Sequence, residues 1–151
     1  MELFNFLINK IMKLVKSTIG KNEKLQSIVK LLENDVPYYD WVGIYIANAS
    51  AKELCLGPFT GEPTVHTKIH FGEGICGKAA DRNETIIVQD VSKETNYLSC
   101  SPFVKSEIVV PIRNNSRIVG ELDIDSNTLS AFTEEDQRFL EDVCNIVSQL
   151  F

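Results

Sequence analysis

Two cysteines of this 151-residue chain occupy positions where a thiol could act as a nucleophile. Cys76 follows a glycine-rich turn in "FGEGICGKAA" and stands at the expected start of a short helix. Free N–H groups and the helix dipole at such a position favour thiolate over thiol. The same position suits a small buried side chain, because free cysteine is among the most buried residue types. Both interpretations of Cys76 stay open from its position alone.

Cys100 lies in "YLSCSPF", a polar stretch without helical or strand periodicity. A loop cysteine has no evident packing role there, and functional residues gather on loops. A functional role and an incidental occurrence of cysteine are therefore both open for position 100. The remaining cysteines, Cys55 and Cys144, stand beside apolar residues in an expected strand and an expected helix, so we interpret both as core residues.

Three acidic residues form a second candidate group. In "ELDIDS", Asp123 and Asp125 are two residues apart on an expected strand, so their side chains leave the same face. Such a pair usually lies on the solvent-exposed face of a half-buried sheet. Glu107 begins the neighbouring strand, "SEIVVPI", and antiparallel pairing could bring it to the same region. Three adjacent carboxylates are costly unless they share a proton or bind a cation such as an ammonium group.

Length and composition bound the setting of these residues. The chain is long enough for one domain with one sizeable core, and its 44% apolar and 24% charged residues are ordinary for a globular protein. The net charge of −6 argues against a nucleic-acid partner. No run of eighteen apolar residues occurs, and the first twenty residues lack the unbroken apolar stretch of a signal peptide. We therefore expect a cytoplasmic protein without membrane insertion, whose four scattered cysteines stay reduced.

The hydrophobic pattern predicts an α+β domain that would position the candidate residues. Residues 1–36 read as two amphipathic helices, residues 41–126 carry the strands and the site, and residues 133–151 form a final helix with Thr133 as its N-cap. We expect an antiparallel sheet of about six strands with the terminal helices on one face. The lysines of the first helix would also suit a membrane surface, but we interpret it as a packing helix. The terminal helices are candidates for a homodimer interface.

The series "DWVGIYI", "LGPFTGEP", "HFGEGICGKAA", "QDVS", "SEIVVPI" and "IVGELDIDS" resembles the free methionine-(R)-sulfoxide reductases, a family of single GAF-domain enzymes. The resemblance runs from about Trp41 to Asp136. It includes the intervals of 24 residues from Cys76 to Cys100, 7 from Cys100 to Glu107 and 16 from Glu107 to Asp123. It implies that residues 1–151 form a single GAF domain.

The resemblance implies roles for both thiols. Cys100 would attack the sulfoxide sulfur, which gives methionine and a cysteine sulfenic acid. Cys76 would then condense with this sulfenic acid to a disulfide. Regeneration of the thiols implies an external dithiol of the thioredoxin type, because exchange passes through a mixed disulfide. No bound cofactor or metal is expected.

The resemblance also implies a pocket for free L-methionine (R)-sulfoxide. Glu107, Asp123 and Asp125 would hold the substrate ammonium and assist at the sulfoxide oxygen, which is a poor leaving group until it is protonated. Trp41 and Tyr45 would surround the methylthio end, where a large apolar face can select the methyl group.

Two positions depart from the family pattern. His66 stands ten residues before Cys76, where many members carry a third cysteine, so a three-cysteine relay is excluded. His66 is then either a polar strand residue or a group that tunes the Cys76 thiolate. The residues after Cys100 are "SPFVKS", where many members of the family have Asp and small residues. This difference concerns the fit of the substrate more than the chemistry of the thiols.

Two other classes of function stay open beside the enzyme. The chain could be a non-catalytic GAF module that binds a small ligand or dimerises in signalling, since one fold hosts many functions. It could also be a structural dimer with incidental cysteines, which would leave the three acids unexplained.

Overall fold

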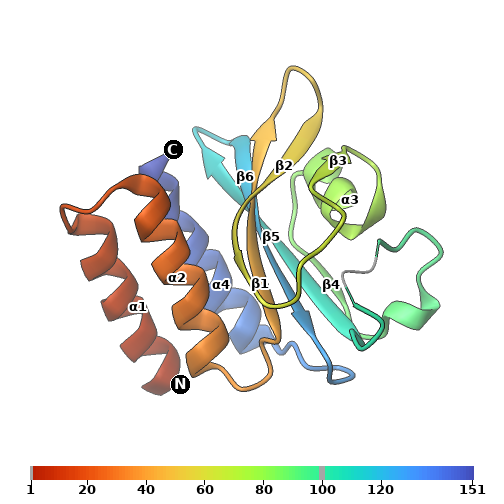
Figure 1. The fold of residues 1–151 in the computed structure, drawn as a ribbon, viewed down its shortest axis with the longest axis horizontal. Coiled ribbons are helices and arrows are strands. Elements are labelled where there is room, and N and C mark those ends of the chain that lie inside the picture. The colour runs from red at the N-terminus through yellow and green to blue at the C-terminus, as the bar shows by residue number, and fades with distance from the viewer. Residues whose placement is uncertain (1, 99–100) are drawn as a thin grey trace.

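The computed structural model describes residues 2–98 and 101–151 (Figure 1). Its helices are α1 (Glu2–Lys16), α2 (Lys21–Asp35), α3 (Gly74–Arg82) and α4 (Glu134–Val147), with short 3-10 turns at Val91–Lys93 and Ser148–Leu150. Its strands are β1 (Trp41–Asn48), β2 (Glu53–Thr60), β3 (Lys68–His70), β4 (Ile86–Val88), β5 (Ser106–Asn114) and β6 (Arg117–Ser126).

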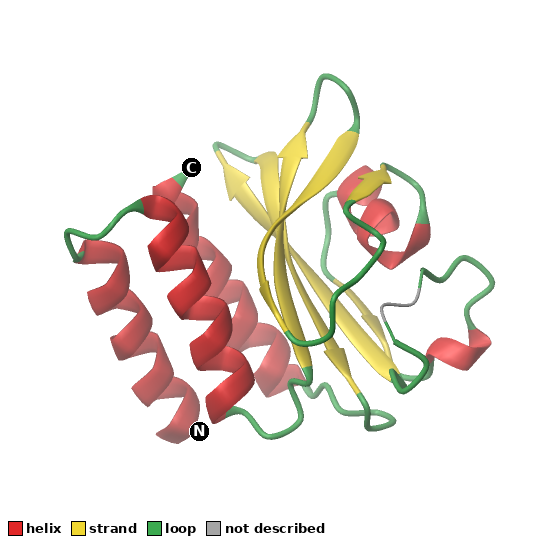
Figure 2. Cartoon of the chain, in the orientation of Figure 1, coloured by secondary structure: helices red, strands yellow, loops and turns green. Residues whose placement is uncertain are grey.

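The strands form one antiparallel sheet of six within the described residues, in the order β3-β2-β1-β6-β5-β4. Helices α2 and α4 pack on one face of this sheet, with α1 against their outer side, and α3 lies on the other face (Figure 2). The predicted α+β architecture, with the N- and C-terminal helices on one face of an antiparallel sheet, is confirmed. None of the described helices is both long and apolar enough to cross a membrane.

The central strands divide their alternate side chains between two cores. Val42 and Ile44 of β1 and Ile124 of β6 pack into the core beneath α1, α2 and α4. Trp41 and Tyr45 of β1 point the other way, into the core beneath α3. Because successive side chains of a strand leave opposite faces, the acids of β6 also point toward α3.

The start of α4 agrees with its sequence signal. Thr133 is the N-cap, and it forms a capping box with Asp136. Asp136 is also fully buried, and it accepts hydrogen bonds of 2.7 Å from the hydroxyls of Tyr38 and Tyr39. These hydrogen bonds connect α4 to Tyr38 and Tyr39, which lie just before β1.

Three local features differ from the sequence pattern. The pattern of residues 64–71 and 85–91 is typical of longer strands, but the strands there are confined to β3 and β4. Cys55 is exposed rather than part of the core, because Leu54 takes the buried position and the next residue of β2 points to the opposite face. Cys144 is buried, as expected, in the core beneath α1, α2 and α4.

Candidate functional site

The two glycines of "GICG" allow α3 to lie close to its neighbours. Gly74 has a φ of +61°, and a Cβ atom there would approach the side chain of Leu98 to 2.9 Å. A Cβ atom on Gly77 would lie 2.5 Å from the carbonyl oxygen of His70. Glycine avoids both clashes and takes the left-handed conformation without strain. This close packing places Cys76, 5% exposed, in the first turn of α3 on its sheet-facing side.

Strand pairing brings the three predicted acids together. Glu107 of β5 is the register partner of Asp125 of β6, and Asp123 lies two residues back along the same face. Their exposed fractions are only 4% for Glu107, 2% for Asp123 and 1% for Asp125. The expectation of a solvent-exposed acidic face is therefore wrong, because α3 packs over β5 and β6 and covers these side chains.

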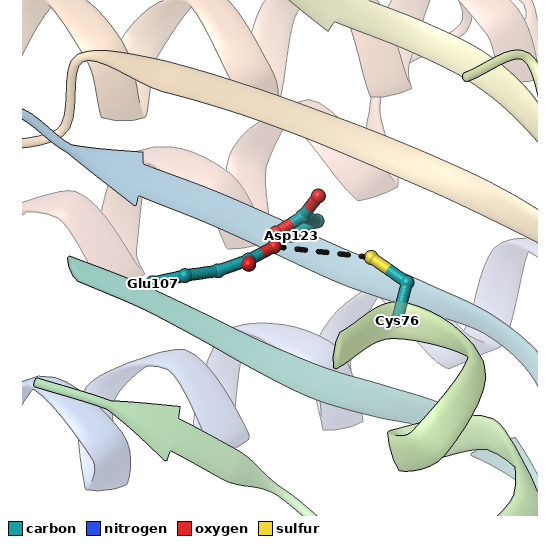
Figure 3. Close-up of side chains that lie close together, drawn as sticks. All are labelled: Cys76, Glu107 and Asp123. Atoms are coloured by element: carbon teal, nitrogen blue, oxygen red, sulfur yellow. Dashed lines mark hydrogen bonds between the residues drawn. The ribbon is translucent and has the colours of Figure 1, made fainter. Parts of the chain in front are cut away.

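The thiol and two of the carboxylates point toward one another from three elements (Figure 3). The Sγ atom of Cys76 donates a long hydrogen bond of 4.0 Å to Oε2 of Glu107. One ligand atom each from Cys76, Glu107 and Asp123 lies within 4.8 Å of the other two. We call these three residues the thiol–carboxylate cluster.

Burial keeps protons on this cluster. It raises the pKa of the Cys76 thiol well above its ordinary value, and the negative charges of Asp123 and Glu107 raise it further. Of the two interpretations left open for Cys76, the structure supports the small buried side chain over the thiolate that a helix start would favour. Burial also raises the pKa of Asp123, an effect that hydrogen bonds with Glu107 and Cys76 partly offset. The cluster can therefore supply a proton to a bound molecule.

A cavity of about 10 Å³ borders the whole thiol–carboxylate cluster, together with Tyr45, His66 and Leu98. This volume is roughly that of one water position. The hydroxyl of Tyr45 donates a hydrogen bond of 2.9 Å to the carbonyl oxygen of His66, which fixes the ring at the cavity wall. A larger molecule could reach the cluster only after the covering segments move.

The structure separates Trp41 from this cavity. Trp41 is 3% exposed, and its ring stacks on that of Phe59 with 5.7 Å between the ring centroids. Its indole N–H donates a hydrogen bond of 2.9 Å to the carbonyl oxygen of Glu62. Trp41 instead lines a neighbouring hollow of about 290 Å³ with Phe103 and Ser101. The other predicted thiol, Cys100, lies outside the described residues.

Glu121 is a buried acid that the sequence reasoning missed. It is fully buried, and neither carboxylate oxygen has a hydrogen-bond partner among the described residues. Burial raises its pKa well above the ordinary value, and the charge of Asp123 adds to this effect. The signal was present in "GELDIDS", because Glu121, Asp123 and Asp125 alternate along one strand and share a face.

Two further residues support the site without a sequence signal of their own. The side chain of Asn96 accepts a hydrogen bond of 2.9 Å from the N–H of Gly74 and donates one of 2.9 Å to the carbonyl oxygen of Gly72. It thereby fastens the segment before β5 to the turn that precedes Cys76. Gly43 lies under the indole of Trp41, and a Cβ atom there would come within 2.3 Å of the ring.

Comparison with known proteins identifies relatives with the same fold. The family model of the GAF domain matches residues 22–151. The free methionine-R-sulfoxide reductase of Saccharomyces cerevisiae is 40% identical over 112 residues, which span 73% of this chain and 62% of the yeast protein.

Two crystal structures superpose closely on this chain. The free methionine-R-sulfoxide reductase from Neisseria meningitidis, solved in complex with its substrate, has a TM-score of 0.91 at 32% identity, over 98% of this chain and 87% of that one. A proposed GAF sensor protein from Burkholderia vietnamiensis has a TM-score of 0.90 at 30% identity, over 98% of this chain and 92% of that one. The overall fold is thus common to a reductase and to a protein of another proposed class.

Proposed function

Because this chain belongs to the GAF domain family and is related to the free methionine-R-sulfoxide reductases, we propose that it reduces free L-methionine (R)-sulfoxide to methionine. The observation that carries the proposal is the buried thiol–carboxylate cluster at the cavity. A thiol-dependent sulfoxide reductase needs an acid at the sulfoxide oxygen and a second thiol that resolves the sulfenic acid, and Asp123 and Cys76 would supply these two groups.

The substrate ammonium would be held by Glu107, Asp123 and Asp125. These carboxylates are buried on one face, and no lysine or arginine of the described chain forms an ion pair with Asp123. A cation that enters the site therefore gains an attraction that solvent screens weakly. Tyr45 lines the same cavity and would contact the apolar part of the substrate, whereas Trp41 would contribute from the neighbouring hollow.

In the first chemical step, the Cys100 thiolate would attack the sulfoxide sulfur while Asp123 donates its proton to the sulfoxide oxygen. The protonated oxygen then moves from the substrate sulfur to the Cys100 sulfur, as the substrate sulfur–oxygen bond and the sulfur–sulfur bond formed in the attack both break, and Cys100 becomes a sulfenic acid. Methionine is the reduced product, and Asp123 is left as a carboxylate. Burial raises the pKa of Asp123, which favours the protonated form that this step requires.

In the second step, Cys76 would give its thiol proton to Glu107, whose Oε2 atom lies 4.0 Å from Sγ. The Cys76 sulfur then attacks the Cys100 sulfur, and hydroxide leaves with the proton from Glu107 as water. The product is a Cys76–Cys100 disulfide. An external dithiol of the thioredoxin type would restore both thiols by exchange, becoming oxidised itself.

A non-catalytic ligand-binding GAF module is the second candidate function. The similarity to a proposed sensor protein supports it. Such a module would bind a small cationic ligand at the same carboxylates without consuming thiols. The single-domain extent over residues 1–151 and a homodimer through α1, α2 and α4 stay predictions under either function.

Resolved epimers of free methionine sulfoxide, incubated with the protein and dithiothreitol, distinguish these functions. We expect methionine from the free R epimer, with the S epimer and a peptide-bound sulfoxide left unchanged, because the carboxylates require a free ammonium group. Equal rates on the peptide-bound substrate would exclude the free-amino-acid specificity. Binding of the R epimer without methionine release would favour the non-catalytic module.

A further inference from the structure

The thiol–carboxylate cluster has the donor set of a site for a thiophilic divalent cation, and we propose that the reduced protein binds Zn²⁺ or Cd²⁺ through Cys76, Glu107 and Asp123. Each residue offers one ligand atom, and all three atoms lie within 4.8 Å of one another in the buried interior (Figure 3). One sulfur with two carboxylate oxygens suits Zn²⁺ and Cd²⁺ better than Mg²⁺ or Ca²⁺, which prefer oxygen ligands alone.

An unpartnered oxygen points to a missing cation at this place. The Oδ1 atom of Asp123 is fully buried and has no hydrogen-bond partner among the described residues. Glu121 adds a second buried carboxyl on the same face of β6, also unpartnered in the part of the chain that the structure describes. Burial favours the protonated form of such carboxyl groups, and a coordinated metal ion would take the place of their protons.

The spacing of the donors fits one ion after a small adjustment. Zinc bonds of about 2.3 Å to sulfur and about 2.0 Å to oxygen, at a tetrahedral angle, separate the two ligand atoms by about 3.5 Å. Sγ of Cys76 and Oε2 of Glu107 are 4.0 Å apart, so a side-chain rotation brings them into range. The adjoining cavity of about 10 Å³ leaves roughly one water-sized position for the ion and its open coordination site.

Binding forms a metal–sulfur bond as the Cys76 thiol releases its proton to solvent, with no change of oxidation state. A Cys76–Cys100 disulfide could not supply this ligand, so we expect the oxidised protein to lose the ion. If the proposed function holds, the ion occupies the resolving thiol and the carboxylates that would hold the substrate ammonium. Zn²⁺ would then inhibit the reductase in competition with free methionine sulfoxide.

Titration of the fully reduced protein with Cd²⁺, monitored by thiolate-to-cadmium charge-transfer absorbance, tests the site without any substrate. We expect one Cd²⁺ per chain for the wild type and no charge-transfer band for Cys76→Ser. Asp123→Asn should weaken binding at least tenfold, because loss of even an outer-shell partner typically costs 10–100-fold in affinity. Cys144→Ser is the matched control, since its thiol is equally buried but packs in the core on the helix side of the sheet.

Thermal unfolding of each variant establishes that it is folded, and diamide-oxidised wild type gives a second readout if Cys76→Ser does not fold. A wild type that binds no Cd²⁺, or a folded Cys76→Ser variant that retains the band, would overturn the proposed metal site. Undiminished binding by oxidised protein in which peptide mapping finds Cys76 in a disulfide would do the same. The sulfoxide assay without metal is independent, so a protein that binds Cd²⁺ but reduces nothing contradicts only the proposed function.

Discussion

The Sγ atom of Cys76 lies 4.0 Å from Oε2 of Glu107, and both side chains are buried on the α3 side of the sheet. In this position the thiol holds its proton, because burial and the neighbouring acids raise its pKa. The same contact gives the proton a nearby acceptor. Under the proposed function, Cys76 would stay unreactive until a sulfenic acid forms on Cys100, which would account for a cysteine directly after a glycine-rich turn.

The two predicted catalytic thiols should differ in single-turnover experiments. Cys100→Ser removes the nucleophile, so we expect no methionine even with stoichiometric enzyme. Cys76→Ser keeps the nucleophile, and we expect about one methionine per chain followed by a stall that small thiols relieve. Methionine is quantified by chromatography after quenching. Full thioredoxin-coupled turnover by both variants would contradict both assignments.

Stoichiometric methionine (R)-sulfoxide should produce a disulfide between Cys76 and Cys100. A disulfide requires Cα atoms within about 7 Å, and α3 holds Cys76 in place, so we expect any rearrangement that the bridge needs to occur in the segment from Ser92 to Lys105. Peptide mapping by mass spectrometry without reductant identifies the pair. Cys144 serves as the internal control, because it packs in the core on the helix side of the sheet. A bridge that includes Cys144 would refute this pairing.

Replacement of Asp123 by Asn should lower kcat by about 10²–10⁴-fold, the usual contribution of a general acid. Its folded-state pKa is raised, so wild-type activity should be present below that pKa and fall as rising pH removes the proton. Asp123→Asn should lack this alkaline decline. Asp81→Asn, on the exposed side of α3, is the control and should retain the wild-type pH profile. An unchanged kcat for Asp123→Asn would exclude the general-acid role.

Glu121→Gln should stabilise the protein at alkaline pH. The folded-state pKa of Glu121 is raised, so the folded protein retains a proton that the unfolded chain releases. The free energy of unfolding therefore decreases as pH rises above the unfolded pKa of about 4.3 toward the folded value. The gain in thermal midpoint from Glu121→Gln should be larger at pH 8 than at pH 5, with exposed Glu84→Gln as control. A gain independent of pH would indicate that Glu121 does not titrate on unfolding.

Gly43→Ala should disturb the packing of the Trp41 indole. The added Cβ would lie 2.3 Å from the Trp41 ring, and overpacking of this kind typically costs about 1–3 kcal/mol. We expect a lower midpoint in chemical denaturation and, under the proposed function, a raised KM for methionine sulfoxide. Gly20→Ala is the control, because its nearest contact, at 3.8 Å, is with the flexible end of Glu23. Wild-type stability and KM in Gly43→Ala would show that the indole is not held by this contact.

The order of the elements could be read from the sequence because it depends on neighbouring residues. Helical periodicity at both ends and period-two alternation between them predict the terminal helices and the strands, and Thr133 marks the start of α4. The same alternation places Asp123 and Asp125 on one face, and the order of strands brings Glu107 beside them. These features follow from local geometry and the shortest antiparallel connections.

Burial and protonation were decided only by tertiary structure. Asp123 and Asp125 resemble a solvent-exposed pair in the sequence, yet α3, nearly fifty residues earlier in the chain, covers them. The same cover raises the pKa of Cys76, where a helix start alone favours the thiolate. The free energy of a charge depends on every atom that excludes water around it, and those atoms come from segments that only the fold brings together.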